Sequence, residues 1–315
     1  MLDKIRLSLK QKTHKDTCKR RGFMMKLKKV ILVALAAMMV LGAAGCGSQQ
    51  GGSEKQTAVK GSITGSGSSA LLPLVKDAAE KFKVNNKDVT ITLNAGGSGT
   101  GLKQVSDGSV DMGNSDVPAE TKLDKAKAEK LTDHKVCVMT VATIINKDVG
   151  VKNLTRQQLA DIFTAKVTNW KDVGGKDMPI VLVTRPKTSG TRALFKQYAI
   201  NGAEEADNKS LETDNSGILI QSVAQNPGAI GYVALPYLIN DKSVDAVSID
   251  GIEPTLENTY SGTYGVWGYE HIYTSKEPKA AVKAFIDYVT GDEYGKRIEE
   301  LGYGVSSKMQ TKEIH

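Results

Sequence analysis

Histidine, cysteine and proline are scarce in this chain. Its 315 residues include 4 His, 3 Cys and 8 Pro, whereas Gly is frequent at 31. Three Cys over this length exclude a disulfide scaffold, and four widely spaced His leave little room for a His-based metal site. A composition of 40% hydrophobic and 24% charged residues excludes long disorder, collagen and a multi-span membrane protein. We therefore expect one or two globular domains with many glycine-containing turns.

The formal charge of +7 comes from the N-terminal segment alone. Residues 1–45 hold 11 Lys and Arg against 2 Asp and Glu. The remaining 31 basic and 33 acidic residues give a net charge of −2. Without the leader the chain has no basic excess, so nucleic acid is not an expected partner.

The leader has the parts of a secretory signal. A basic segment at 25–29 precedes an uninterrupted apolar run at 30–41, and small residues then lead to Cys46. Cys directly after small residues resembles the lipobox of bacterial lipoproteins, whose thiol is acylated. An uncleaved membrane anchor is the alternative, but the apolar run is short for a span. The resemblance predicts lipidation at Cys46 and a position at the cell membrane, facing the extracellular side.

The expected organisation is therefore a leader at 1–45, a flexible polar tether at 46–57 and a folded part that begins near Val59. Residues 1–24 are atypical of a signal start, and Met24 or Met25 is an alternative initiator. Cys137 lies between apolar neighbours, which predicts a buried core thiol.

Short apolar strands alternate with amphipathic helices along the rest of the chain. The predicted strands begin or lie at 62–64, 89–93, 135–145, 180–183 and 229–233. The predicted helices follow Ser68 or Ser69 to about Lys83, begin at Thr100 and after Thr155, and cover 189–199, 217–224 and 278–301, with Gly291 as an interruption. This alternation indicates an α/β fold with a mainly parallel sheet.

Three segments share one pattern, in which a strand ends, the chain turns through Gly and hydroxyl residues, and a helix opens. They lie at 64–70, 96–101 and 185–192. A helix N-terminus presents free N–H groups and the positive end of a dipole, which suits a small anion. None of the three fits the P-loop spacing or a dinucleotide fingerprint.

Asp116 follows a fourth segment, Asp111-Met-Gly-Asn-Ser115, near these turns. A carboxylate repels an anion unless the anion carries a hydrogen to donate. Hydrogen phosphate does so at neutral pH, whereas sulfate does not. An acceptor-only carboxylate therefore favours phosphate over sulfate.

Seven segments of the chain form a recognisable set of motifs: 65–74, 96–103, 110–116, 154–163, 168–172, 189–191 and 226–232. Together they resemble the phosphate-specific substrate-binding proteins of ABC transporters, the PstS family. By motif position, the resemblance implies a phosphate-binding set of Ser69, Ala70 (through its amide), Ser98, Asp116, Arg185, Ser189, Gly190 and Thr191. Relatives often carry an acidic residue between the Arg and the Ser-Gly-Thr trio, where this chain has Pro186-Lys187-Thr188. That departure bears on affinity and on the geometry of Arg185.

The resemblance also implies a two-lobed fold of the type II periplasmic-binding-protein class, with two crossover strands forming the hinge. The expected crossings lie near 142–147 and 264–273. Lobe one would then comprise 58–145 plus 266–315, and lobe two 146–265. The implied role is capture of inorganic phosphate and its delivery to an ABC-transporter permease, with no cofactor, no metal and no catalysis.

Three other functions stay open at the level of sequence. The same fold could take another oxyanion, namely sulfate, molybdate or tungstate, which Asp116 disfavours. A phosphatase-type enzyme would need an activated nucleophile or metals, and no His accompanies a motif Ser. A surface sensor or adhesin could keep phosphate as a structural ligand.

Overall fold

The computed structural model describes residues 59–206 and 210–311. Cys46, the leader and all of the predicted tether lie outside these residues. The strands are β1 (Gly61–Gly67), β2 (Val89–Ala95), β3 (Met112–Ser115), β4 (Leu131–Asn146), β5 (Asn153–Leu154), β6 (Val181–Thr184), β7 (Ser210–Glu212), β8 (Ala229–Ala234), β9 (Val244–Ile249) and β10 (Trp267–Ser275). The α-helices are α2 (Leu72–Asn85), α3 (Ser98–Ser106), α4 (Lys125–Ala128), α5 (Arg156–Phe163), α6 (Gly190–Tyr198), α7 (Ser216–Gln225), α8 (Leu256–Tyr260), α9 (Ala280–Val289) and α10 (Asp292–Ile298). Short 3-10 turns include η4 (Leu235–Leu238) and η5 (Glu299–Leu301).

The strands pair in the order β2-β1-β3-β10-β4-β8-β6-β7, and β9 pairs with both β4 and β5. β1 is parallel to β2 and β3, and β6 is parallel to β7 and β8. β5 is also parallel to β9, and these parallel pairs agree with the expected mainly parallel sheet. β10 and β4 run antiparallel to each other and to the strands on either side of them. The difference arises because these two strands carry the chain in opposite directions through the middle of the sheet.

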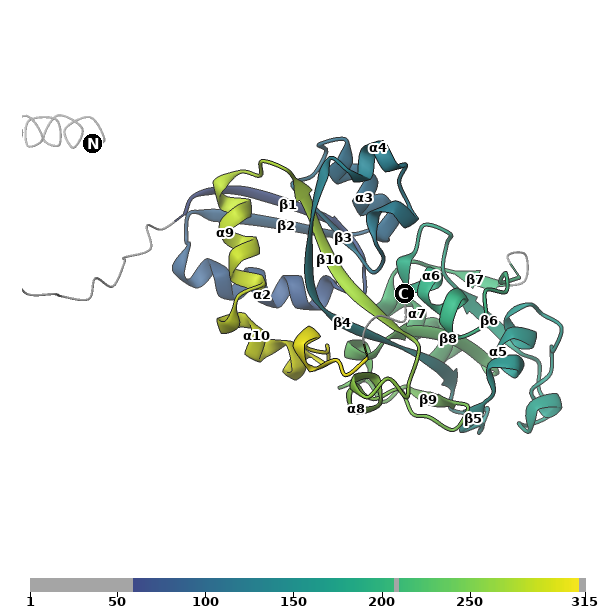
Figure 1. Cartoon of the computed structure of the whole chain (residues 1–315). Helices are drawn as coiled ribbons and strands as arrows, with labels where there is room; N and C mark the ends of the chain where they lie inside the picture. The colour runs from purple at the N-terminus through teal and green to yellow at the C-terminus, as the bar shows by residue number, and fades with distance from the viewer. Residues whose placement is uncertain (1–58, 207–209, 312–315) are drawn as a thin grey trace, which may run out of the picture. The chain divides into compact units, whose positions relative to one another are not determined.

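β4 belongs to both halves of the fold. Its first part pairs with β10 as far as Thr140, which lies opposite Trp267. From Val141 onward it pairs with β8, and Val141 lies opposite Ala234. We call the part built on β1–β3, α2, α3, α9 and α10 the first lobe, and the part built on β6–β9 and α5–α7 the second lobe. Figure 1 shows β4 and β10 running side by side from one lobe to the other.

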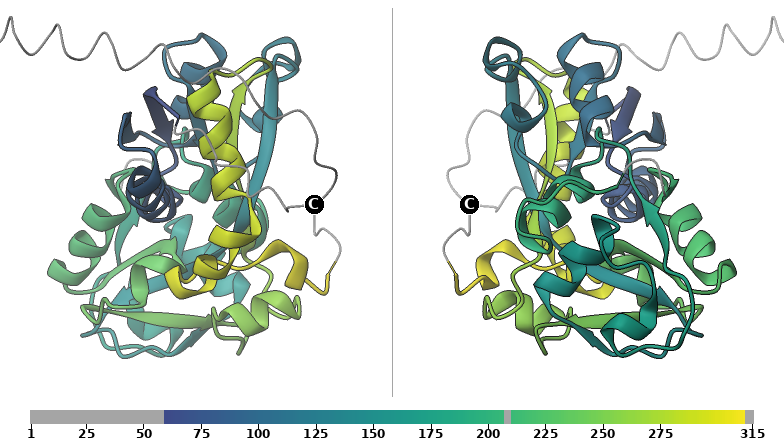
Figure 2. Two further views of the ribbon diagram at one scale, coloured as in Figure 1. Left: turned by 90° about the vertical axis from the view of Figure 1, so that its left-hand side faces the viewer. Right: turned by 90° about the vertical axis from the view of Figure 1, so that its right-hand side faces the viewer.

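Each lobe has a hydrophobic core of its own. In the first lobe, α2 and α9 pack their apolar faces against the sheet, and Phe82 meets Phe285 edge to face with ring centroids 5.4 Å apart. In the second lobe, Phe195 stacks on Tyr232 at 4.1 Å. In Figure 2 the purple and blue segments of the first lobe gather at one end and the green segments of the second lobe at the other. Residues of the first lobe and of the second lobe that face each other are therefore positioned by two different hydrophobic cores.

Several predicted helix starts are confirmed by their caps. The Thr155 hydroxyl accepts from the Gln158 amide at 3.1 Å, and the Gln158 side chain accepts from the Thr155 amide at 2.8 Å. This capping box fixes the start of α5. Ser189 caps α6 by accepting from the Arg192 amide at 3.3 Å. The predicted C-terminal helix is divided at Gly291 into α9 and α10.

Cys137 is a buried, free thiol in β4, as predicted. Burial raises its pKa well above the usual value, so the neutral thiol is the stable form. Among the described residues, no helix is both long enough and apolar enough to cross a membrane.

Candidate anion-binding site

The turn after β1 supplies two serine hydroxyls with different tasks. The Ser68 hydroxyl accepts from the amides of Ala70 and Leu71, at 3.0 and 3.1 Å, and so closes the turn into α2. The Ser69 hydroxyl instead reaches the second lobe, where it donates to the main-chain oxygen of Asp214 at 2.7 Å and lies 3.0 Å from the Ser216 hydroxyl. The predicted ligand amide of Ala70 is thus bonded within its own turn.

The second turn places Ser98 at the start of α3, where it is completely buried. Its hydroxyl accepts from the Asp116 amide at 3.0 Å. Gly97, just before it, has a positive φ of 81°. A Cβ on Gly97 would lie 1.8 Å from Oδ2 of Asp214, so only glycine fits between α3 and the second lobe.

Asp116 is a buried carboxylate that follows β3 and faces the second lobe. Its Oδ2 accepts from the Thr191 hydroxyl at 2.6 Å. Among residues 59–206 and 210–311, no donor reaches its Oδ1. A Cβ on Gly190 would lie 2.3 Å from the Ser98 hydroxyl oxygen and 2.9 Å from the Asp116 Cβ. The N-terminus of α6 therefore lies directly against the Ser98 and Asp116 side chains.

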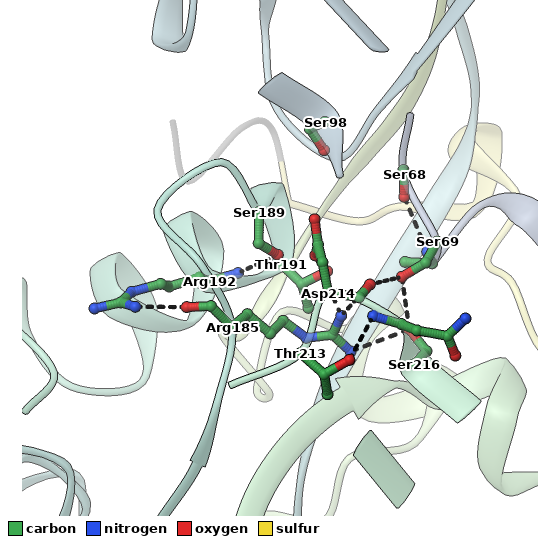
Figure 3. A network of polar contacts seen from close by, with 12 residues as sticks. Ser68, Ser69, Ser98, Arg185, Ser189, Thr191, Arg192, Thr213, Asp214 and Ser216 are labelled. Carbon is green, nitrogen blue, oxygen red and sulfur yellow. Dashed lines mark hydrogen bonds and ion pairs between the residues drawn. The ribbon is translucent and has the colours of Figure 1, made fainter. Parts of the chain in front are cut away.

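Arg185 is a fully buried cation that follows β6. Its guanidinium donates to the main-chain oxygen of Asp214 at 3.3 Å, to the Ser216 hydroxyl at 3.0 Å and to the main-chain oxygen of Tyr232 at 3.5 Å. Its Nε has no acceptor among the described residues. The contacts with Asp214 and Ser216 hold the guanidinium beside the Ser69 turn, as Figure 3 shows.

Sequence reasoning missed the acidic partner of Arg185. Oδ1 of Asp214 lies 3.7 Å from the Arg185 guanidinium. The segment 186–188 after Arg185 has no acidic residue, and Asp214, from a distant segment, supplies the nearby carboxylate instead. Burial is the main cause that raises the pKa of Asp214 to about 6, and the charge of Asp116 adds to it. Arg185, a hydrogen bond from Ser189 and the charge of Lys122 act in the opposite direction.

A sequence signal for Asp214 existed. The segment 213–216 joins a strand to a helix through polar residues, as the three predicted turns do, and Asn215 caps α7 by accepting from the Ile218 amide at 3.0 Å. The preceding strand, β7, has only three residues and gives a weak strand signal in the sequence.

The two lobes also contact each other beside these side chains. The Gly99 amide donates to the main-chain oxygen of Thr188 at 2.9 Å. The Lys122 ammonium donates to the main-chain oxygen of Lys187 at 2.8 Å, and burial lowers the pKa of Lys122. The side chain of Lys187 itself is exposed. Lys122 belongs to a charged run, 122–130, that the sequence predicts to be a solvated helix face, but its ammonium instead adds positive charge near Asp116 and Asp214.

The structure gathers seven of the eight predicted residues into one connected group. Hydrogen bonds link Ser69 to Arg185 through Asp214 and Ser216, and link Ser98 to Thr191 through Asp116. Ser189 and Gly190 open the helix that carries Thr191. Figure 3 shows hydroxyls from both lobes turned toward this region. Hydroxyls, one guanidinium, a helix N-terminus and an acceptor carboxylate suit a tetrahedral oxyanion that carries a hydrogen.

Comparisons with known proteins agree with this chemistry. The chain matches the PBP superfamily domain over residues 52–293. It is 46% identical to the phosphate-binding protein PstS of Bacillus subtilis (strain 168), over 89% of this chain and 94% of that protein. The chain belongs to the PstS family. The PstS protein of Staphylococcus epidermidis (strain ATCC 12228 / FDA PCI 1200) is 30% identical, with 92% of each chain covered.

Solved structures give the same assignment to the PstS family. A proposed phosphate ABC transporter substrate-binding protein from Clostridium perfringens, solved with bound phosphate, has a TM-score of 0.71 and 33% identity. The alignment covers 78% of this chain and 99% of that one. An ABC-type phosphate transport receptor from Vibrio cholerae has a TM-score of 0.62 and 27% identity, with 77% and 99% covered. The predicted type II, two-lobed α/β fold is thereby confirmed.

Proposed function

We propose that this chain binds inorganic phosphate between its lobes and delivers it to the permease of an ABC transporter. The observation that carries the proposal is the position of Asp116. Its carboxylate stands between the N-terminus of α6 and the Ser98 turn, in a region otherwise supplied with donors. A carboxylate is useful there only if the bound anion brings a hydrogen, as hydrogen phosphate does.

The binding set that we propose consists of the predicted residues: Ser69, Ala70, Ser98, Asp116, Arg185, Ser189, Gly190 and Thr191. Membership of the PstS family supports the role, since its relatives carry the name phosphate-binding protein. Because each lobe contributes only part of the set, a bound anion favours the closed arrangement of the lobes. The lobes that we propose comprise 58–145 plus 266–315 and 146–265.

Calorimetric titration tests this proposal. The full-length protein, solubilised in detergent and stripped of co-purified phosphate, is titrated with phosphate, sulfate and molybdate. We expect tight binding of phosphate and at least 100-fold weaker binding of the other two anions. Equal affinity for sulfate, or no heat with phosphate, would overturn the proposal.

The proposed function is binding without bond chemistry. The Ser98 hydroxyl accepts an amide hydrogen from Asp116, and no histidine of the described ranges is bonded to it. Both described histidines interact elsewhere, His134 with Thr274 and His271 with Asp133. Incubation with a chromogenic phosphomonoester checks this: release of the chromophore above the rate in buffer would instead support a phosphatase.

We further propose that the chain is anchored by a lipid on Cys46 and faces the extracellular side of the cell membrane. Cys46 lies outside the described residues, so the lipobox-like sequence is the support. Cells fed a clickable palmitate analogue should label the wild-type protein and its Cys18→Ser variant but not Cys46→Ser. Label retained on Cys46→Ser would contradict the anchor.

A further inference from the structure

A second acidic side chain lies beside Asp116 on the strand that joins the lobes. Glu270 on β10 is completely buried. In the antiparallel β3–β10 ladder, His271 lies opposite Ser115, so the next position places Glu270 beside Asp116. β10 runs close to the chain there, since a Cβ on Gly268 would lie 3.4 Å from the main-chain oxygen of Asp116. The two carboxyl groups are therefore cross-strand neighbours.

Both carboxyl groups have oxygens that receive no hydrogen bond from the described part of the chain. In the described ranges, no donor reaches either oxygen of Glu270 or the Oδ1 of Asp116. Two ionised carboxylates side by side and out of water would repel each other strongly. One proton between them removes the repulsion and supplies the missing donor, because a neutral carboxylic acid donates to a carboxylate.

The surroundings determine that Glu270 is the group that holds the proton. Asp116 receives a hydrogen bond from Thr191, which opens α6, and the helix N-terminus favours a negative charge. Glu270 has no such support. Burial raises the pKa of Glu270 well above its usual value, and the charge of Asp116 and a hydrogen bond to Asp116 raise it further.

The other titratable groups that interact with Glu270 are uncharged at neutral pH. They are the Cys137 thiol on β4, the Tyr237 hydroxyl on η4 and the Tyr303 hydroxyl beyond η5. Burial raises the pKa of all three, and each of these groups is neutral in its protonated form. None of them supplies a positive charge that would hold Glu270 ionised.

We propose that Glu270 is a positioning residue for phosphate selectivity, because it donates its proton to Asp116 and holds that carboxylate as the acceptor for the ligand's hydrogen. The inference rests on the proposed function. Without this donor, no described residue holds the Oδ1 of Asp116, and the carboxylate can rotate away from the ligand's hydrogen. A carboxylate that has rotated away repels sulfate less, so the preference for phosphate falls.

Two substitutions at Glu270 distinguish the effect of losing the hydrogen-bond donor from the effect of changing the size of the side chain. Glu270→Gln keeps a neutral donor of the same size, whereas Glu270→Leu removes it; Glu257→Gln, on the exposed part of α8, is the matched control. The ratio of sulfate Kd to phosphate Kd is measured by calorimetry on the full-length protein from pH 5.5 to 8.5. We expect both Gln variants within about threefold of wild type and a ratio about 10- to 100-fold lower for Glu270→Leu.

The loss in Glu270→Leu, taken relative to wild type at each pH, should persist across this range, because it comes from the missing donor to Asp116. An unchanged ratio in Glu270→Leu, or the same loss in Glu270→Gln, would overturn the role of Glu270. If wild type still bound phosphate, the proposed function would stand. If wild type bound no phosphate, both would fall.

Infrared difference spectroscopy gives an answer that does not depend on the folding of the Leu variant. Wild type at pH 7 should show the C=O stretching band of a protonated carboxyl group, and that band should be missing from Glu270→Gln and present in Glu257→Gln. Its persistence in Glu270→Gln would overturn the proposal.

Discussion

The two lobes bring different chemistry to the site. The second lobe contributes the guanidinium of Arg185, the N-terminus of α6 and a neutralising carboxylate, Asp214. The first lobe contributes two hydroxyls and Asp116, the acceptor that an anion must satisfy with a hydrogen. Under the proposed function, attraction to the anion comes mainly from the second lobe and the choice among anions from the first. Substitutions on the second lobe should change affinity for all oxyanions, whereas those at Asp116 should change selectivity.

Arg185→Met should have the largest effect, since it removes the buried cation and leaves Asp214 without its partner. We expect phosphate affinity to fall by about 100-fold or more, because loss of one member of a buried charged contact is costly. Calorimetry measures the loss. Arg156→Met, which removes a surface ion pair with Asp250, is the control and should leave Kd within about twofold. A selective loss of phosphate with sulfate unchanged would contradict the division between lobes.

Asp116→Asn should act on selectivity. The amide can donate as well as accept, so the site no longer requires a hydrogen from the ligand. We expect the ratio of sulfate Kd to phosphate Kd to fall about 10- to 100-fold. Competition between phosphate and sulfate measures the ratio, and Asp148→Asn at an exposed position should leave it unchanged. Equal weakening of both anions would show that Asp116 serves only structure.

Asp214→Asn should strengthen phosphate binding in a pH-dependent way. The raised pKa of about 6 means that Asp214 is ionised above pH 6 and neutral below it. Its negative charge opposes a bound anion only at the higher pH. We expect about fivefold tighter binding in the variant at pH 7.5 and little difference from wild type at pH 5. Because both proteins meet the same ligand species at each pH, the ratio of their Kd values isolates the carboxylate. A ratio that does not change with pH would refute this assignment.

Gly97→Ala should have the smallest effect and tests the contact between the lobes. Both Gly97 and Gly150 have positive φ, 81° and 78°, but a Cβ on Gly150 would meet nothing within 4 Å. Each alanine variant should lose about 1 kcal/mol of stability from backbone strain. Only Gly97→Ala should lose phosphate affinity, and Asp214→Ala should restore part of that loss. Equal behaviour of the two glycine variants would exclude the contact with Asp214.

Local sequence predicted the parts of the fold that depend on neighbouring residues. Thr155 and Ser189 cap their helices as expected, because a cap is decided within three residues. The α/β fold was predicted, but the antiparallel direction of β4 and β10 was not, because it depends on how two distant segments pass each other. The resemblance named the site residues by motif, and the structure brings seven of them together; their role as phosphate ligands stays a prediction.

Contacts between distant segments could not be predicted from the sequence. Asp214 is 29 positions from Arg185, and Glu270 is more than 150 positions from Asp116, so no spacing rule connects either pair. Their acidic side chains carry no local signal, since Asp and Glu are ordinary on surfaces. Only the register of β3 against β10 places Glu270 beside Asp116.

Cys137, the one cysteine among the described residues, lies opposite Glu270 in the β4–β10 ladder. Its thiol is buried and held neutral, so alkylating reagents reach it only when these central strands part. Alkylation of Cys137 therefore reports on the opening of the structure beside Asp116 and Glu270. At a reagent concentration high enough for alkylation to outpace reclosing, the rate of Cys137 alkylation equals the rate of that opening.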